Sequence, residues 1–165
     1  MSTVRTAVLE HVGGLDFKSV TGTGRTIDFG DVERGYLSPV ETVLVAVGAC
    51  TAMDVISIAV KKRQKVASYR VHVHGDQRTE YPQVFTEIEV VHEMTGEGLS
   101  EAAIRRSIEL SATKYCPISA MISAGATVVH HRYVIHATGA AAYEAHGEVI
   151  ATGPYAKPDV IAEGR

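Results

Sequence analysis

The pattern of apolar and polar positions divides the first 62 residues into short strands followed by one long apolar run. Residues 3–10, 15–20 and 25–29 have the composition of strands, and the Gly13–Gly14 pair marks a turn between the first two. The run from Val43 to Val60 is the longest apolar stretch, and its length is that of a helix rather than a strand. The pattern therefore predicts three strands and then a helix that is apolar nearly all round.

The start of this helix carries strong local signals. Ser38 suits the N-cap, Pro39 suits the first helical position, and Glu41 completes a capping box. We expect the helix to run to about Lys62 or Lys65, where the basic sequence KKRQK complements the negative end of the helix dipole.

The second half predicts two strands, two helices and a final strand. The expected ranges are 69–75 and 84–93 for strands, 100–114 and 117–124 for helices, and 126–136 for the last strand. From Ala137 to Arg165 the chain is rich in small residues, glycine and proline, so we expect a peripheral C-terminal extension after a domain of residues 1–136. This order of elements predicts an α+β fold in which a long buried helix packs on an antiparallel sheet.

Composition narrows the class of protein. A chain of 165 residues with 45% hydrophobic residues is long enough for one domain with its own core. Its net charge of −3 argues against nucleic-acid partners and against binding to a membrane surface. An aspartate inside the apolar run argues against a membrane span. The N-terminus has no apolar signal region, and two cysteines in such a chain predict a reducing compartment, the cytoplasm.

The long helix carries its polar groups on one face. Cys50, Asp54, Ser57 and Lys61 follow the spacing i, i+4, i+7 and i+11, which places them along one stripe. Such a stripe can line a pocket, meet another subunit or pair with a polar strand. The alternative is a packing groove of small residues that holds one paired aspartate.

The second cysteine lies at a predicted helix start. With Pro117 at the first helical position, Cys116 falls at or beside the N-cap, where the helix dipole and nearby Lys114 would stabilise a thiolate. The alternative is a small buried thiol at a helix junction. A redox pair of Cys50 and Cys116 and two structural thiols both remain open at this point.

The histidines offer a weaker site. His72 and His74 share one face of a strand, a spacing that can hold a metal if His130, His131 or His136 supplies a third ligand. Exposed strand histidines are the default interpretation. We expect neither a metal nor a cofactor.

Two motifs together resemble a known family. The segment SPVETVLVAVGACTAMDVISIAVKKR, followed by KYCPISAMI, is similar to the OsmC/Ohr family over about residues 1–136. The resemblance implies an intertwined homodimer in which the two long helices are buried and both subunits shape each active site. It also implies a thiol-dependent peroxidase that acts on organic hydroperoxides and protects against oxidative stress.

The resemblance also assigns roles to residues. Cys50 would attack the hydroperoxide, Cys116 would resolve the sulfenic acid to a disulfide, and an external dithiol would reduce it. In the best-studied peroxidases of the family, an arginine follows the paired glycines of the first hairpin, where this chain has Leu15. Their glutamate follows the helix-start proline, where this chain has Val40, so Glu41 is the candidate partner. Arg25 and Arg34 are candidates for the cation.

Two functions are therefore carried forward. The first is the hydroperoxide reductase just described. The second is an OsmC-like dimer without peroxidase activity, which would bind a small apolar ligand in a pocket lined by Cys50 and Asp54.

Overall fold

The computed structural model describes residues 3–151, and these fall into two compact units. The first spans Met1–Val43 and the second spans Leu44–Arg165. The 23-residue helix α1 (Pro39–Lys61) begins in the first unit and continues through the second. The mixed α+β class predicted from the sequence is confirmed.

The first unit is a three-stranded antiparallel sheet. It contains β1 (Ala7–Gly13), β2 (Asp16–Thr21) and β3 (Thr26–Phe29), in that order, followed by a short 3-10 turn, η1 (Val32–Arg34). The glycine pair turns the chain between β1 and β2, because both glycines adopt positive φ angles of 134° and 56°. All three predicted strands are therefore present.

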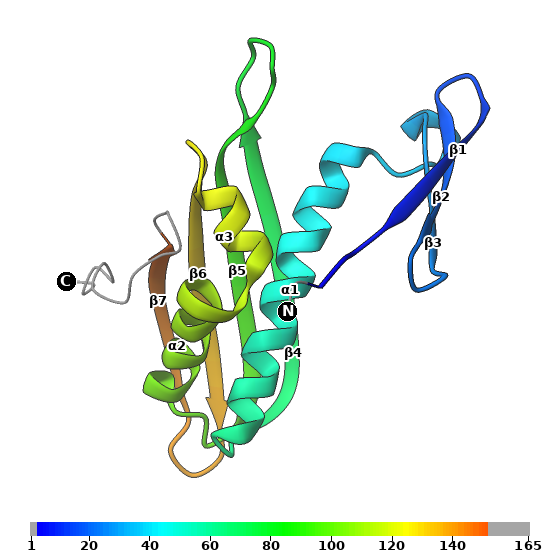
Figure 1. The fold of residues 1–165 in the computed structure, drawn as a ribbon. Helices are drawn as coiled ribbons and strands as arrows, with labels where there is room; N and C mark the ends of the chain where they lie inside the picture. The colour runs from blue at the N-terminus through cyan, green and yellow to red at the C-terminus, as the bar shows by residue number, and fades with distance from the viewer. Residues whose placement is uncertain (1–2, 152–165) are drawn as a thin grey trace. The chain divides into compact units, whose positions relative to one another are not determined.

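The second unit is built on a four-stranded sheet in the order β4-β5-β6-β7 (Figure 1). Its strands are β4 (Lys65–Gln77), β5 (Phe85–Glu97), β6 (Val128–Thr138) and β7 (Tyr143–Ala151). The β4–β5 pair is antiparallel, as expected, and so is the pair of β6 with the unpredicted strand β7, but β5 and β6 are parallel, which corrects the prediction of an antiparallel sheet. The sheet is mixed because helices connect β5 to β6 and return the chain to the same end of the sheet.

One face of this sheet carries the core. Alternate residues of β5 and β6 are completely buried there, among them Ile88, Val90, Val129 and Ile135. Helix α1 lies in front of β4, while α2 (Glu101–Leu110), the π-helical turn η2 (Ser111–Tyr115) and α3 (Pro117–Ser123) cover β5 and β6 (Figure 1). The predicted caps of α2 and α3 are present, since Ser100 accepts a hydrogen bond from the amide of Ala103 and Cys116 occupies the N-cap of α3. At the start of α1, the Ser38 hydroxyl accepts a hydrogen bond from the amide of Val40 at 3.3 Å, not from that of Glu41 as a capping box requires.

Helix α1 is buried on one face only within the single chain. Val47, Thr51, Val55 and Ala59 recur every fourth residue and are fully buried against the second unit. Between them lie exposed apolar side chains: Val45, Met53 and Val60 are 63%, 71% and 60% exposed. By length and composition α1 could cross a membrane, a test that core helices also pass, and 28% of its most apolar window is buried in the chain. The sequence prediction of a fully buried helix therefore does not hold within one chain.

The expected boundary at residue 136 falls inside β6. Residues 143–151 form β7, which pairs with β6 along its length from Ala137–Tyr143 to Val129–Ala151. The hydroxyl of Tyr143 also accepts a hydrogen bond from the amide of Glu101 and donates one to the carbonyl of Leu99, at 2.9 and 2.6 Å. The first part of the predicted extension is thus an edge strand of the sheet, and residues 152–165 lie outside the described residues.

Candidate functional site

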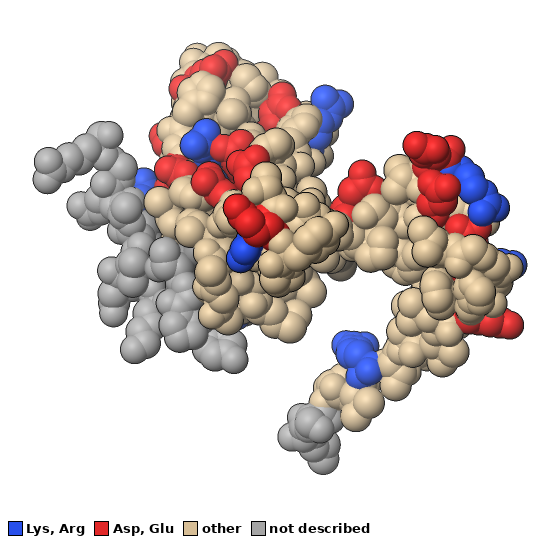
Figure 2. Space-filling view, turned by 90° about the horizontal axis from the view of Figure 1, so that it is seen from above, with Lys and Arg blue, Asp and Glu red and all other residues tan. Residues whose placement is uncertain are grey.

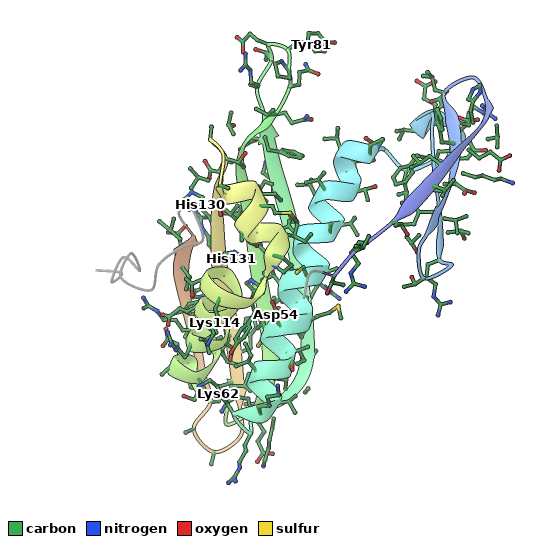
Figure 3. The ribbon with its side chains drawn as sticks, viewed as in Figure 1. Asp54, Lys62, Tyr81, Lys114, His130 and His131 are labelled. Atoms are coloured by element: carbon green, nitrogen blue, oxygen red, sulfur yellow. The ribbon has the colours of Figure 1, made fainter. Side chains whose placement is uncertain are left out.

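The polar stripe of α1 divides into two halves. Cys50 and Asp54 are half-buried and face the segment that contains η2 and α3, whereas Ser57 and Lys61 are exposed. Figure 3 shows Asp54 on the side of α1 that faces this segment. One helical turn separates Cys50 from Asp54, so both side chains point to the same neighbour. The N-terminal half of the predicted stripe, which contains Cys50 and Asp54, therefore faces polar groups of η2 and α3 in the same unit.

Cys116 brings the second sulfur to this surface. Its side chain is 2% exposed, and the preceding π-helical turn and Pro117 hold it at the start of α3. The sulfur accepts hydrogen bonds from the amide of Ser119 at 3.3 Å and from the hydroxyl of Thr51 at 3.6 Å. Since Thr51 adjoins Cys50 on α1, this contact joins the two cysteine-bearing segments.

The three reactive groups form one cluster. The sulfurs of Cys50 and Cys116 and a carboxylate oxygen of Asp54 all lie within 4.8 Å of one another. Oδ2 of Asp54 also accepts a 3.1 Å hydrogen bond from the hydroxyl of Ser111. The structure therefore brings together the two cysteines that the sequence singled out, although 66 positions separate them.

This environment disfavours a thiolate at Cys50. Burial, the hydrogen bond with Cys116 and the nearby charge of Asp54 raise the pKa of the Cys50 thiol to about 12, against a lowering by the backbone of Ile118. The charge of Asp54 thus opposes a thiolate at Cys50. In this unit Cys50 is a protonated thiol at neutral pH.

No cation compensates for this within the second unit. Among residues 44–151, no lysine or arginine forms a hydrogen bond or ion pair with Cys50, Asp54 or Cys116. The ammonium of Lys114, on the turn before α3, lies 5.3 Å from the centre of the Tyr115 ring (Figure 3). The described residues of the second unit therefore offer Cys50 no hydrogen-bonded or ion-paired cation.

The candidate cations of the first unit have contacts of their own. Arg34 forms a 2.6 Å ion pair with Asp16, whose side chain is 5% exposed. Leu15, at the position of the family arginine, is 79% exposed. Glu41 lies exposed in the first turn of α1, nine residues before Cys50 and about 14 Å away along the helix axis.

Two cavities adjoin this region of the second unit. An apolar groove of about 480 Å³ lies between α1 and β4, where Gly48, Ala49 and Tyr69 are among its lining residues. Cys50 and Asp54, the pocket residues expected from the sequence, do not line this groove. A smaller pocket of about 270 Å³ reaches Cys116 from the side of η2 and α3.

The sequence interpretation missed a buried chain of polar groups. The hydroxyl of Tyr69 lies 2.7 Å from Nδ1 of His92, and Nε2 of His92 lies 3.3 Å from Nδ1 of His131. Both histidines are fully buried, and burial is the main cause that lowers the pKa of each, to about 4 for His131. His92 lies within the predicted strand 84–93 and continues the buried alternation of Ile88 and Val90, so the sequence already contained this signal.

The predicted metal-ligand histidines are dispersed. His72 and His74 lie on the exposed face of the sheet, where they pair with Glu93 and Asp76 at 3.4 and 3.2 Å. His131 points to the opposite, buried face (Figure 3). The described residues do not bring His72 and His74 together with a third ligand.

Comparison with known proteins places the chain in a family. A sequence model of the family described as "OsmC-like protein" matches residues 31–131, well over half of the chain. The chain belongs to the OsmC-like family. The resemblance inferred from the two cysteine motifs is therefore confirmed.

Individual relatives support this assignment of the OsmC-like chain. Protein YhfA of Escherichia coli K12 is 36% identical over 132 residues, which cover 79% of this chain and 98% of YhfA. The crystal structure of a hypothetical protein from Aquifex aeolicus VF5 is 28% identical, with a TM-score of 0.75 and coverage of 84% of this chain and 100% of the other.

A more distant structure shares only the fold. An organic hydroperoxide resistance protein OsmC from Legionella pneumophila is 16% identical, with a TM-score of 0.57 and coverage of 81% of this chain and 96% of the other.

Proposed function

We propose that this OsmC-like protein is a thiol-dependent peroxidase that reduces organic hydroperoxides in the cytoplasm and protects against oxidative stress. The observation that carries the proposal is the approach of the Cys50 and Cys116 sulfurs to within 4.8 Å of each other. Cys50 is half-buried and Cys116 is 2% exposed, which suits an attacking thiol and a protected resolving thiol. The name of the Legionella pneumophila neighbour supports the substrate class.

In the proposed reaction, the Cys50 thiolate attacks the distal oxygen of the hydroperoxide. The O–O bond breaks, the alkoxide takes up a proton and leaves as an alcohol, and Cys50 becomes a sulfenic acid. The thiol of Cys116 then forms a disulfide with Cys50 and releases water. An external dithiol reduces the disulfide and is itself oxidised.

The reaction requires a positive charge beside Cys50, because the pKa of its thiol is raised to about 12 in the second unit. We assign this charge to Arg25 or Arg34 of the first unit, from the same chain or from a second copy. Glu41 would orient that guanidinium. The approach of the guanidinium would lower the pKa of Cys50 and so activate it.

A homodimer is part of this proposal. The exposed apolar side chains of α1, Val45, Met53 and Val60, form a stripe that is unfavourable in water. A second copy that packs on this stripe would bury it away from water.

A second candidate function rests on the apolar groove between α1 and β4. Its volume of about 480 Å³ and its lining of small and branched side chains suit a small apolar ligand. The raised pKa of Cys50 fits this function, because a ligand-binding protein needs no thiolate. In this function the OsmC-like dimer would bind the small apolar ligand and would not catalyse its conversion.

Thiol counting before and after a stoichiometric dose of cumene hydroperoxide separates the two functions. We expect the wild type to lose two alkylatable thiols and to form an intramolecular disulfide, while Cys50→Ser keeps Cys116 reduced. Cys116→Ser should stop at a sulfenic acid on Cys50. If both thiols of the wild type stay alkylatable, the peroxidase proposal fails, and a ligand-induced thermal shift that survives Cys50→Ser would support the binding function.

A further inference from the structure

The cluster of Cys50, Cys116 and Asp54 has the composition of a ligand set for a soft divalent cation. Two sulfurs and one carboxylate oxygen lie within 4.8 Å of one another, and each is a good ligand when it is deprotonated. In a tetrahedral zinc site, Zn–S distances of about 2.3 Å place the ligand atoms about 3.5–3.8 Å apart. The three groups therefore need to move by roughly 1 Å to surround one ion.

Hydrogen-bond donors of the second unit surround the three groups of the cluster. Cys116 accepts hydrogen bonds from Thr51 and from the amide of Ser119, and Asp54 accepts one from Ser111. The backbone of Ile118 forms a hydrogen bond with the sulfur of Cys50, while burial and the neighbouring groups still raise the pKa of this thiol, so the cation has to displace its proton. Each of the three ligand atoms thus has a donor behind it, which is how outer-shell groups hold metal ligands in place.

The lack of a lysine or arginine paired with the cluster among residues 44–151 also favours a bound cation. Three groups that can each be negative face one another, and no lysine or arginine among residues 44–151 pairs with them. A divalent cation would supply this charge at the centre of the cluster, where it offsets the repulsion between two thiolates and a carboxylate. The pocket of about 270 Å³ at η2 and α3 gives access to Cys116 from outside.

We propose that the reduced protein binds one zinc-like divalent cation through the sulfurs of Cys50 and Cys116 and the carboxylate of Asp54. Binding releases the two thiol protons, so the affinity rises with pH. Three protein ligands leave a fourth position of a tetrahedral ion for water or another small ligand. The site rests on the closeness of the two thiols, as the proposed peroxidase does, but it needs no oxidation.

The two activities exclude each other at any moment. A bound cation occupies both thiolates and protects them from a hydroperoxide, whereas a Cys50–Cys116 disulfide removes two of the three ligands. The cation would therefore hold the pair in its reduced, unreactive form.

Cobalt provides the test because thiolate ligation of Co²⁺ produces a charge-transfer absorption in the near ultraviolet. Metal-free, fully reduced full-length protein is titrated anaerobically with Co²⁺, and the bound ion is then displaced with Zn²⁺. We expect one Co²⁺ per chain with the charge-transfer band, about half the band or less in Cys50→Ser and Cys116→Ser, and at least about tenfold weaker binding in Asp54→Asn. Asp76→Asn, on the exposed face of the sheet, serves as the matched control and should bind as the wild type does.

Several outcomes would overturn the proposal. Absence of the band, or a band that both cysteine variants retain, shows that the cluster is not the site. Binding without the band places the ion on the histidines and carboxylates of the outer sheet face. If a cysteine variant does not fold, alkylation of both thiols in the wild type gives the same test, because it must abolish the band. Disulfide formation is measured separately on metal-free protein, so each proposal can fail without the other.

Discussion

The hydroxyl of Ser111 donates a 3.1 Å hydrogen bond to Oδ2 of Asp54, across 57 positions of sequence. Ser111 is the first residue of η2 and is fully buried. Its hydrogen bond holds the Asp54 carboxylate in place one helical turn from Cys50. Asp54 therefore has a partner that holds it in place without neutralising it. Its negative charge stays directed at the thiol, and this is one reason why the pKa of Cys50 is raised.

Removal of this charge should make Cys50 more reactive. Asp54→Asn keeps the size of the side chain but removes one cause of the raised pKa of Cys50, so more thiolate is present at any pH below that pKa. We expect iodoacetamide to alkylate Cys50 faster by up to about tenfold at fixed pH, measured in the Cys116→Ser background. Asp76→Asn is the control, and equal rates in all three proteins would contradict the role given to Asp54.

The buried histidines should make stability depend on pH. Burial, with a smaller effect of His130, lowers the pKa of His131 from 6.5 to about 4, so the folded state resists protonation that the unfolded chain accepts. The contribution of the neutral ring is fully present above pH 6.5 and is lost as the pH falls from 6.5 towards 4. This single group accounts for about 3 kcal/mol of the free energy of unfolding across that window.

Urea unfolding of the wild type and of His131→Gln at pH 7 and pH 5 measures this dependence. We expect the wild type to lose more of its free energy of unfolding between these pH values than the variant does. His74→Gln, at an exposed position, should keep the wild-type dependence. An unchanged dependence in His131→Gln would show that other groups cause it.

Tyr143 tests whether β7 belongs to the domain. Its hydroxyl links β7 to the N-terminus of α2 through Glu101 and Leu99, at 2.9 and 2.6 Å. Tyr143→Phe leaves the carbonyl of Leu99 and the amide of Glu101 without this partner. Because Tyr143 is 39% exposed and water can replace its hydroxyl, we expect a loss of about 0.5–1.5 kcal/mol in chemical unfolding. Tyr81→Phe is the control, because Tyr81 is 87% exposed at the tip of the β4–β5 hairpin (Figure 3). Equal stability of the two variants would show that the hydrogen bonds of the Tyr143 hydroxyl do not stabilise the attachment of β7 to α2.

The exposed apolar stripe of α1 predicts that a charged substitution there weakens the proposed dimer. Met53 is 71% exposed in the single chain, and Met53→Glu would place a carboxylate inside the proposed interface, where burial is costly. We expect the variant to sediment as a monomer at concentrations where the wild type is a dimer. Met121→Glu, at a position that is 63% exposed on α3, should leave the dimer intact. A wild type that is monomeric at all concentrations would refute the proposed assembly.

The charged surface agrees with the composition. On the face seen in Figure 2, acidic and basic side chains of the second unit are interspersed. The outer sheet face carries pairs such as Arg132–Glu89 at 2.7 Å and His130–Glu148 at 2.8 Å. The net charge of −3 therefore arises from side chains of both signs.

Local signals were sufficient to predict most elements. The Ser38–Pro39 start of α1, the Ser100 cap of α2 and the Cys116–Pro117 start of α3 all lie where the sequence placed them, because caps depend on a few neighbouring residues. The strand β7 escaped prediction because its glycine and alanine residues give a weak period. Pairing with β6 and the hydrogen bonds of Tyr143 stabilise β7. Both are contacts with residues distant in the sequence, so a short stretch of sequence does not reveal them.

The sequence by itself determined the α+β class, the family and the two cysteines, since each depends on residue type and short-range spacing. Only the tertiary structure decided that Cys50, Asp54 and Cys116 meet, that β5 and β6 run parallel, and that His92 and His131 are buried side by side. The physical reason is the same in each case. Contacts between distant segments depend on how elements pack on one face of a sheet, and the energy of a thiol or an imidazole depends on the charge and burial that this packing creates.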